Sequence, residues 1–451
     1  MEYKKDIKLD LNSDLEKLTL IIKDDNEQIN APESLCSEIF NDFPYINDIR
    51  SMNFTSIETF KALIESEFVD YFCEKLYNHL NNNSGKYQNN VFRKKATDPS
   101  LILSNICLLF SSGPYEFQME LINRNYPKLL VRFLNSANTQ EQFIILRSIS
   151  HTMGSNEEII AYFVQNMGIQ PIIDILENTS DDKVRKQAAY ILTQFLKIEL
   201  IQALFEQITD LLLTTAKKYH EIYNYYLVLA LHNVSLYNPS WLLVNNKFLS
   251  LQHFISISDE AISAFACDAI TRTIQVMDME TFQSFIVNCQ IWDKITMAII
   301  KNERITVRKS ILVLAISIIQ KEPESHILGI EAKFFITIGQ LLATSSHEIK
   351  HLISLFFIDI YEYLGNTIFE IVSVEFEMFS TLCSLIQQQS FENLPKLIIM
   401  LGNHVKHTEN FPAEYAEEYK EALIDAIDTN DEIADLAITI LDDLFGDKNQ
   451  D

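Results

Sequence analysis

Residues Val184–Gln194, which read VRKQAAYILTQ, decide the fold of this chain because the same pattern returns along it at regular intervals. Its apolar residues are spaced three and four apart, as on one face of an α-helix. Related stretches are TQEQFIILRSI (Thr139–Ile149), YNYYLVLALHN (Tyr223–Asn233), VRKSILVLAIS (Val307–Ser317), IKHLISLFFID (Ile349–Asp359) and NLPKLIIMLGN (Asn393–Asn403). A helical pattern that recurs in this way predicts one array of stacked repeats rather than several unrelated domains.

The last residue of each stretch can be used as an anchor to measure the period. The register also reaches Asn105, which closes KATDPSLILSN, and more weakly Arg272. The anchors are Asn105, Ile149, Gln194, Asn233, Arg272, Ser317, Asp359 and Asn403. Consecutive anchors are 39 to 45 residues apart, which is the period of armadillo and HEAT helical repeats.

A second unit lies between the anchors. INRNYPKLLVRFLNS (Ile122–Ser136) and VQNMGIQPIIDILEN (Val164–Asn178) share an apolar turn, a proline and a long amphipathic helix. Pro127 and Pro171 fall where a helix begins, and there the missing N–H costs little. Each repeat is therefore predicted to hold a short turn or helix, a second helix and a longer third helix. Since such a unit cannot bury its apolar face alone, we predict an all-α fold, a right-handed α-α superhelical solenoid of about eight to nine repeats of the armadillo or HEAT type.

The composition agrees with helices joined by short loops. Glycine accounts for only 9 of 451 residues, against roughly 7% in average proteins. Phosphate-cradling loops, β-hairpins and dinucleotide-binding fingerprints all need glycine, so the chain has room for few of them. The six cysteines are scattered without a CxxC pair, which indicates buried thiols in a reducing compartment and no metal site.

The net charge of −26 disfavours a nucleic-acid partner and favours a basic protein partner. The N-terminus lacks an apolar signal core, and no apolar run is long enough to cross a bilayer. We therefore expect a location in the cytoplasm and nucleus, with no membrane partner.

The domain boundaries follow from local composition. Residues 1–35 are polar and charged and are predicted to be a mobile tail, residues 36–447 the solenoid, and residues 448–451 a short tail. Residues 81–100, NNNSGKYQNNVFRKKATDPS, are predicted to be an exposed loop. Their lone SGK lacks the other residues of a P-loop.

Several of these stretches resemble armadillo repeats, and more particularly those of importin-α, the adaptor that carries nuclear-localisation-signal cargo. The similar stretches are QEQFIILRSI (Gln140–Ile149), NICLLFSSG (Asn105–Gly113) and NMGIQPII (Asn166–Ile173). The end of the chain, Tyr419–Asp447, resembles the last helices of importin-α, which close with an aromatic residue, a glycine and acidic residues. The likeness covers about Asn41 to Asp447 as a diffuse pattern.

The resemblance implies a peptide-binding groove. In importin-α, asparagines clamp the cargo backbone, and tryptophans four residues earlier flank lysine and arginine stems. The peptide-binding candidates are Asn105, Asn233 and Asn403, with Gln194 and Tyr190 as weaker ones. No tryptophan occupies the equivalent positions, which hold Leu101, Ile145, Tyr190, Leu229, Asp268, Val313, Leu355 and Ile399. The two tryptophans, Trp241 and Trp292, lie elsewhere, and Trp292 is predicted to pack in the core.

The implied function is that of a non-enzymatic adaptor for nuclear protein import, which binds an extended basic segment of its cargo and needs no cofactor. Importin-β or an exportin is a further candidate partner. However, acids outnumber basic residues in Met1–Ser51, where importin-α carries its basic importin-β-binding segment. The alternative is an armadillo scaffold or regulatory subunit with an unrelated protein ligand.

A third reading is a zinc protease, because HEIKH has the HExxH spacing with His347, Glu348 and His351. Polar residues precede this string, and no convincing third ligand follows it. The repeat register accounts for it as well, since Ile349–His351 align with Val184–Lys186. We therefore predict that the chain is not an enzyme.

Overall fold

The structure is a computed structural model that describes residues 61, 64–65, 68–83, 107, 110–111, 113–154, 156–198, 202–219, 222–365, 376–387, 393–428 and 431–446. In this part the chain forms α-helices and three short stretches of 3-10 helix, without any strand. The predicted all-α class is confirmed. The predicted tails at residues 1–35 and 448–451 lie outside the described residues, as do residues 84–100 of the predicted loop, whose first residues instead complete a helix.

The chain divides into two compact units, residues 1–152 and 153–451. The first contains α5 (Phe68–Asn83), α7 (Tyr115–Asn123), α8 (Tyr126–Ser136) and α9 (Thr139–Met153). Its core is aromatic: the ring of Phe110 lies 5.0 Å from that of Phe72 and 5.6 Å from that of Phe117. The buried hydroxyl of Tyr126 donates to the backbone oxygen of Cys107 at 2.9 Å.

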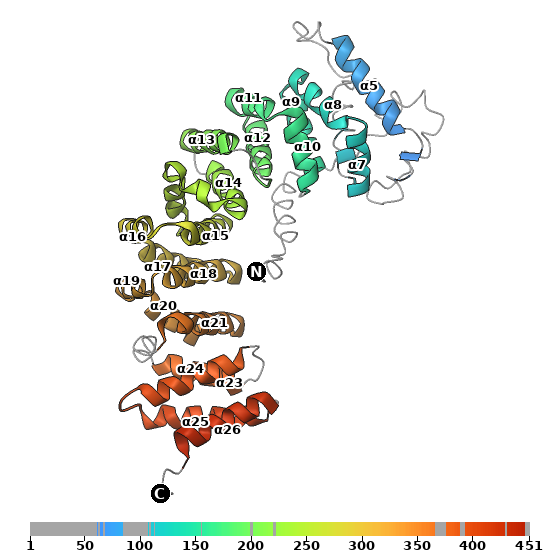
Figure 1. The fold of residues 1–451 in the computed structure, drawn as a ribbon. Helices are drawn as coiled ribbons and strands as arrows, with labels where there is room; N and C mark the ends of the chain where they lie inside the picture. The colour runs from blue at the N-terminus through green and yellow to red at the C-terminus, as the bar shows by residue number, and fades with distance from the viewer. Residues whose placement is uncertain are drawn as a thin grey trace. The chain divides into compact units, whose positions relative to one another are not determined.

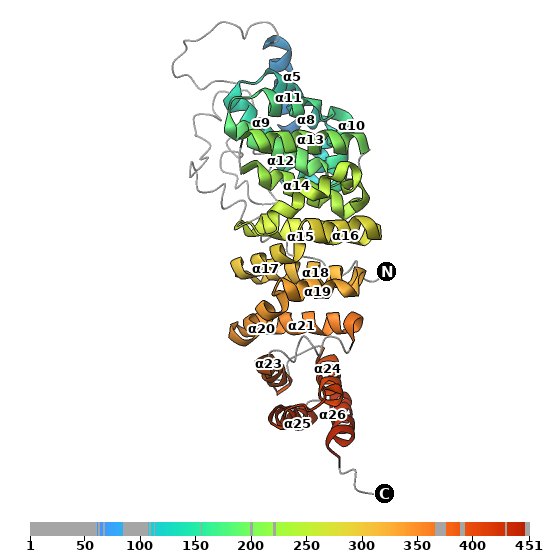
Figure 2. The same ribbon diagram turned by 90° about the vertical axis from the view of Figure 1, so that its left-hand side faces the viewer.

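The second unit contains six helices that carry the sequence anchors, which we call the anchor helices. They are α12 (Asp182–Phe195), α14 (Ile222–Tyr237), α15 (Glu260–Val276), α18 (Ile305–Lys321), α21 (His347–Leu364) and α24 (Leu394–His407). Each packs on the next in chain order, so they form one layer, in which α15, α18 and α21 are stacked one below another (Figures 1 and 2).

The remaining helices of this unit pack beside the anchor helices. One set precedes or follows its anchor helix directly: α11 (Gln170–Asn178), α13 (Gln202–Tyr219), η2 (Val244–Phe254), α17 (Ile291–Lys301), α20 (Phe334–Thr344), α23 (Phe376–Gln387) and α25 (Ala413–Ile427). The others are α10 (Glu157–Met167), η1 (Pro239–Leu242), α16 (Met279–Asn288), η3 (Pro323–Ser325), α19 (His326–Glu331) and the final α26 (Asp431–Phe445), which packs on α24 and α25.

Polar side chains join consecutive repeats at the predicted period. Tyr223 donates to Asp182 at 2.7 Å across 41 positions, and Lys321 donates to the backbone oxygen of Met277 at 2.7 Å across 44 positions. The period read from the sequence is thus the spacing at which neighbouring repeats contact each other.

Polar side chains cap the starts of two of these helices. The first turn of α12 is capped by Asp181, whose carboxylate accepts from the backbone N–H of Val184. Asn138 and Glu141 form a reciprocal capping box at the start of α9. One prediction was wrong. The proline-led third helix was predicted to be longer than the second, but the helices that begin at Pro127 and Pro171 have 11 and 9 residues. The anchor helices have 14 to 18. The polar break before each anchor helix stops the proline-led helix early.

A residue with positive φ precedes α8, α11, α17 and α20. Asn125 (φ 56°), Gly168 (69°), Gln290 (50°) and Lys333 (58°) stand at or one residue before the N-caps of α8, α11, α17 and α20. The last of these corners turns the chain by 75° between Pro323–Glu331 and Phe334–Thr344. Only one of the four is glycine, so side chains occupy a conformation that costs L-residues roughly 1 kcal/mol. The scarcity of glycine therefore does not mean that left-handed corners are rare.

The core confirms two further predictions. The described cysteines, Cys73, Cys107, Cys267, Cys289 and Cys383, are all buried free thiols. Trp292 is only 2% exposed and packs on Phe334 with the ring centroids 5.3 Å apart. Among the described residues, no single helix combines the length and apolar composition of a membrane span, although two sharply bent helix pairs meet both criteria when taken together.

Candidate peptide-binding surface

The residues four positions before the anchors lie on the solvent side of the anchor helices. On the six anchor helices, Val313 and Ile399 are exposed, Tyr190, Asp268 and Leu355 are half-buried, and Leu229 is buried; the equivalent Ile145 of α9 is buried as well. We use the name anchor face for the surface that these positions form together with the half-buried residues one turn earlier, such as Tyr226 and Phe265. Because one position recurs on each helix, this face offers a regular series of side chains to a ligand that crosses the helices.

The side chains of three anchors form hydrogen bonds to the preceding anchor helix. The side-chain amide of Asn233, which is 3% exposed, donates to the backbone oxygen of Thr193 at 2.9 Å. Arg272 donates to Ser235 Oγ at 3.3 Å, and Asn403 donates to the hydroxyl of Tyr361. We call these three contacts the lateral ties.

The lateral ties bear on the predicted peptide clamps. The amides of Asn233 and Asn403 each already bond to a neighbouring repeat in this state of the protein. An amide has two N–H donors and an oxygen with two acceptor sites, so one tie does not exhaust its capacity. Their role as backbone clamps stays a prediction, and Asn105 lies outside the described residues.

Gln194 and Tyr190 lie on α12. Gln194 is buried; its Nε2 donates to Thr193 Oγ1 at 3.4 Å, and its Oε1 accepts no hydrogen bond from the described residues. A buried acceptor left in this way costs about 1–3 kcal/mol. Tyr190 is half-buried, and burial raises the pKa of its phenol. These two candidates thus lie at different depths.

An aromatic cluster on α14 and α15 was not among the predicted site residues. The ring of Phe265 lies 4.8 Å from His232 and 6.4 Å from Tyr225, and Tyr225 lies 5.5 Å from Tyr226. Burial and the nearby phenol of Tyr190 raise the pKa of Tyr226 to about 12. The signal was present in the sequence, because Tyr226 and Phe265 each stand three positions before a residue equivalent to an importin-α tryptophan.

Asp268 places a carboxylate beside this cluster. Its Oδ2 lies 3.9 Å from His232 Nε2. Burial lowers the pKa of His232 to about 3, so the ring is neutral at pH 7 and the contact is not an ion pair. Burial also raises the pKa of Asp268, while Arg272 and a hydrogen bond to Ser310 oppose that rise. A half-buried carboxylate next to aromatic rings suits a lysine or arginine side chain, because both groups attract a cation.

The HEIKH string forms the first turn of anchor helix α21, as the repeat register predicts. The rings of His347 and His351 lie 6.3 Å apart, and His347 is exposed. Within the described ranges, no three histidine, cysteine, aspartate or glutamate residues are grouped so that they could hold a metal ion.

Comparison with known proteins bears on the fold alone. No protein-family model and no curated protein matches the chain. An engineered protein from a structural genomics consortium is similar in structure, with a TM-score of 0.62 and 16% identity over 86% of this chain and 91% of that one. A second engineered protein (TM-score 0.44, 15% identity, 55% of this chain and 97% of that one) and a designed armadillo repeat protein (0.43, 17%, 53% and 99%) are more distant. With its period and layered helices, the chain has an armadillo-like repeat fold.

Proposed function

We propose that this chain is a non-enzymatic adaptor whose anchor face binds an extended basic segment of a partner protein. The observation that carries the proposal is the cluster of Tyr225, Tyr226, Phe265 and Asp268 on consecutive anchor helices, with Tyr190 beside it. Aromatic faces flank the apolar stem of a lysine or arginine, and the carboxylate neutralises its charge. The net charge of −26 would attract such a segment over a longer range.

The repeat geometry suits an extended ligand. Packed helices lie roughly 8–10 Å apart, and an extended chain rises about 3.3 Å per residue. Two or three ligand residues would therefore pass each anchor helix. The anchors Asn233 and Asn403 are spaced along this path as backbone clamps, with Gln194 as a further candidate.

Binding of a basic probe tests this proposal. A fluorescein-labelled extended peptide with five consecutive lysines would be titrated with the full chain, and a glutamate counterpart would serve as the negative probe. We expect Asp268→Lys to weaken binding about tenfold, because it replaces a half-buried attraction by a repulsion. Glu280→Lys, which makes the same change in charge at an exposed site on α16, is the matched control.

The variant Asn233→Ala tests binding of the peptide backbone separately from the attraction between charges. If Asn233 holds the peptide backbone, its replacement weakens the lysine and a mixed-sequence extended probe to the same extent. Failure of the lysine probe to bind, or equal weakening by Asp268→Lys and Glu280→Lys, would refute the proposed basic segment.

Within this proposal, the finer assignment is nuclear import in the manner of importin-α, with the chain shuttling between cytoplasm and nucleus. It rests on the sequence resemblance of the repeats and of Tyr419–Asp447. The test is whether the full chain carries a lysine-signal reporter into nuclei of permeabilised cells with importin-β added. If the probe binds but is not imported, the adaptor proposal stands and the importin-α assignment is rejected.

One observation favours the second candidate function, a scaffold with an unrelated ligand. The exposed residues at two of the tryptophan-equivalent positions are Val313 and Ile399. Aliphatic side chains there suit apolar ligand residues better than cationic ones. Tighter binding of a leucine-rich neutral peptide than of the lysine probe, lost in Val313→Asp, would select this candidate.

A further inference from the structure

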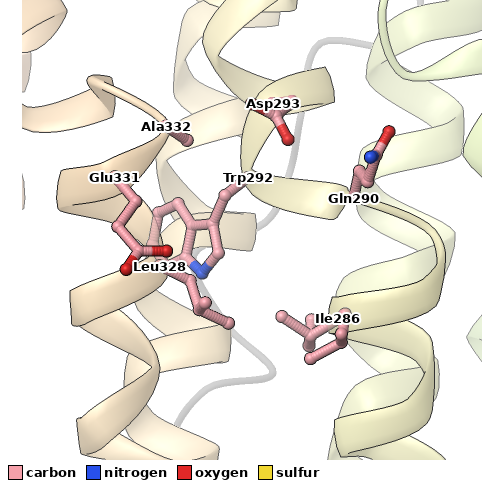
Figure 3. Close-up of a pocket in the computed structure, with 8 residues that line it drawn as sticks. Ile286, Gln290, Trp292, Asp293, Leu328, Glu331 and Ala332 are labelled. Atoms are coloured by element: carbon pink, nitrogen blue, oxygen red, sulfur yellow. The ribbon is translucent and has the colours of Figure 1, made fainter.

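A small pocket lies between α16, α17 and α19, away from the residues of the anchor face. Its volume is about 200 Å³. It is lined by Ile286, Val287, Gln290, Trp292, Asp293, Leu328, Glu331 and Ala332 (Figure 3). This volume is below the range of roughly 300–1,000 Å³ that is usual for sites of drug-sized ligands and cofactors. It is the size of one large side chain.

The wall of the pocket contains a hydrogen-bond donor without an acceptor. Trp292 is 2% exposed, and its indole Nε1 is buried and bonds to no atom of the described residues. In Figure 3 the indole nitrogen lies on the ring edge nearest Leu328 and faces the space toward Ile286. Leu328 is only partly buried, so a ligand that displaces it can bring a backbone oxygen to the indole.

Part of the pocket lining is apolar and exposed. Val287, which lines the pocket, is 59% exposed, and Leu328 of the lining has two exposed sequence neighbours in α19, Ile327 at 52% and Ile330 at 44%. Single exposed aliphatic residues are ordinary, but one in the wall of a pocket adds apolar surface that a ligand can cover.

The charge of the pocket selects its occupant. Asp293 and Glu331 line it, both are exposed, and neither forms an ion pair with a described residue. The nearest lysine in sequence, Lys294, bonds instead to Gln252 Oε1 at 2.6 Å and to the backbone oxygen of Cys289 at 2.5 Å. The lining therefore holds two negative charges and no positive one.

We propose that this pocket is a second docking site, which takes one large apolar side chain from a protein segment that carries lysine or arginine beside it. The apolar side chain fills the pocket against Trp292, the flanking cation pairs with Asp293 and Glu331, and exposed aliphatic residues cover the rest of the segment. The site shares no residue with the anchor face, so it does not depend on the function proposed above.

Tryptophan fluorescence reports directly on this site. Trp241 and Trp292 are the only tryptophans in the chain, and Trp241→Phe keeps a ring against Phe205, on which Trp241 stacks at 5.4 Å. In this background Trp292 is the sole emitter. The probe is a twelve-residue peptide of lysine and leucine in helical spacing, and its comparisons replace every lysine by glutamate or every leucine by serine.

We expect the lysine–leucine peptide to shift the emission of Trp292, and the other two peptides to leave it unchanged. Val287→Asp, which changes an exposed apolar side chain of the lining, should weaken binding about tenfold or more through lost apolar burial, and Glu331→Lys about fivefold through the lost exposed ion pair. Ile300→Asp is the matched control, because Ile300 is an exposed aliphatic residue of α17 that does not line the pocket.

Three results would overturn the proposal: no change in the emission of Trp292 at high peptide concentration, equal binding of the glutamate peptide, or equal weakening by Val287→Asp and Ile300→Asp. Circular dichroism of each variant establishes that its helices are intact. If Val287→Asp fails this check, it is replaced by Val287→Ser, a smaller change to the same exposed side chain of the pocket.

Discussion

Replacing Gly329 by alanine tests how tightly α19 is pressed against the aromatic core. A Cβ at this position would lie 2.9 Å from Cε2 of Phe335 and 3.1 Å from two ring atoms of Trp292. Ordinary carbon contacts are about 3.5–4.0 Å, so the rings would have to withdraw by about half an ångström. Both rings are held in place: Phe335 lies against Phe334 at 5.6 Å, and Trp292 lies against the same ring at 5.3 Å.

The expected cost is the difference between two effects. Insertion of a methyl group into a packed core costs about 1–3 kcal/mol. Alanine in place of glycine in a helix returns about 1 kcal/mol, although α19 has only six residues and gains less than a long helix. The net prediction is a loss of about 1 kcal/mol in the free energy of unfolding.

The assay is urea unfolding followed by Trp292 emission in the Trp241→Phe background, because repeat proteins can unfold in parts and a local reporter follows this part. A second variant, Phe335→Leu, removes the nearest clashing ring atom and leaves the two of Trp292. In that background Gly329→Ala should cost less than in the unchanged protein, so the two changes should be coupled by about 0.5 kcal/mol. Stabilisation by Gly329→Ala alone, or an unchanged cost beside Phe335→Leu, would refute the reasoning.

Three further changes follow from contacts described by the structure. Asn233→Ala removes the bond to the backbone oxygen of Thr193 and should lower the free energy of unfolding by about 1 kcal/mol, measured by urea denaturation; an unchanged midpoint would show that the tie contributes nothing. Lys247→Met removes bonds from the ammonium to Thr209 Oγ1 at 2.6 Å and to an exposed aspartate and should cost about 1–2 kcal/mol, seen as a lower thermal midpoint; a midpoint equal to that of the unchanged protein would contradict this. Burial lowers the pKa of His404 from 6.5 to about 4, so the unfolded chain binds more protons than the folded one between these pH values, and the free energy of unfolding should fall as the pH drops from about 7 to 4. His404→Gln should reduce that fall in a series of denaturation curves at different pH. The same fall in both proteins would count against this prediction.

Most of the layered fold could be predicted from the sequence, because periodic burial decides it. The anchor at Gln194 marks a helix whose buried side repeats every turn, so the residue pattern places this helix, whereas its cap by Asp181 was found in the structure. The lengths of the proline-led helices could not be placed in the same way. Their apolar pattern continues to the polar break, and only the packing of the next anchor helix determines how much of it stays helical.

The site was predicted less completely, for a different physical reason. The repeat pattern predicts Asn233 as a peptide-binding residue, but it cannot say whether the nearest acceptor belongs to a ligand or to the adjacent helix. That acceptor is the backbone oxygen of Thr193, 40 positions earlier. Likewise, Trp292 was predicted as core, and it is, yet the pocket at its edge arises from α19, whose glycine lets the helix approach.

The lateral ties make the repeats of this chain individual modules rather than interchangeable ones. No two ties use the same combination of donor and acceptor: an amide with a backbone oxygen, a guanidinium with a serine, and an amide with a phenol. If α13 and α14 were cut out together, Arg272 would lose its partner Ser235, which lies on α14. Lengthening or shortening this protein by whole repeats would therefore break matched polar pairs at the new junction, so its repeat order is best treated in engineering as a fixed series.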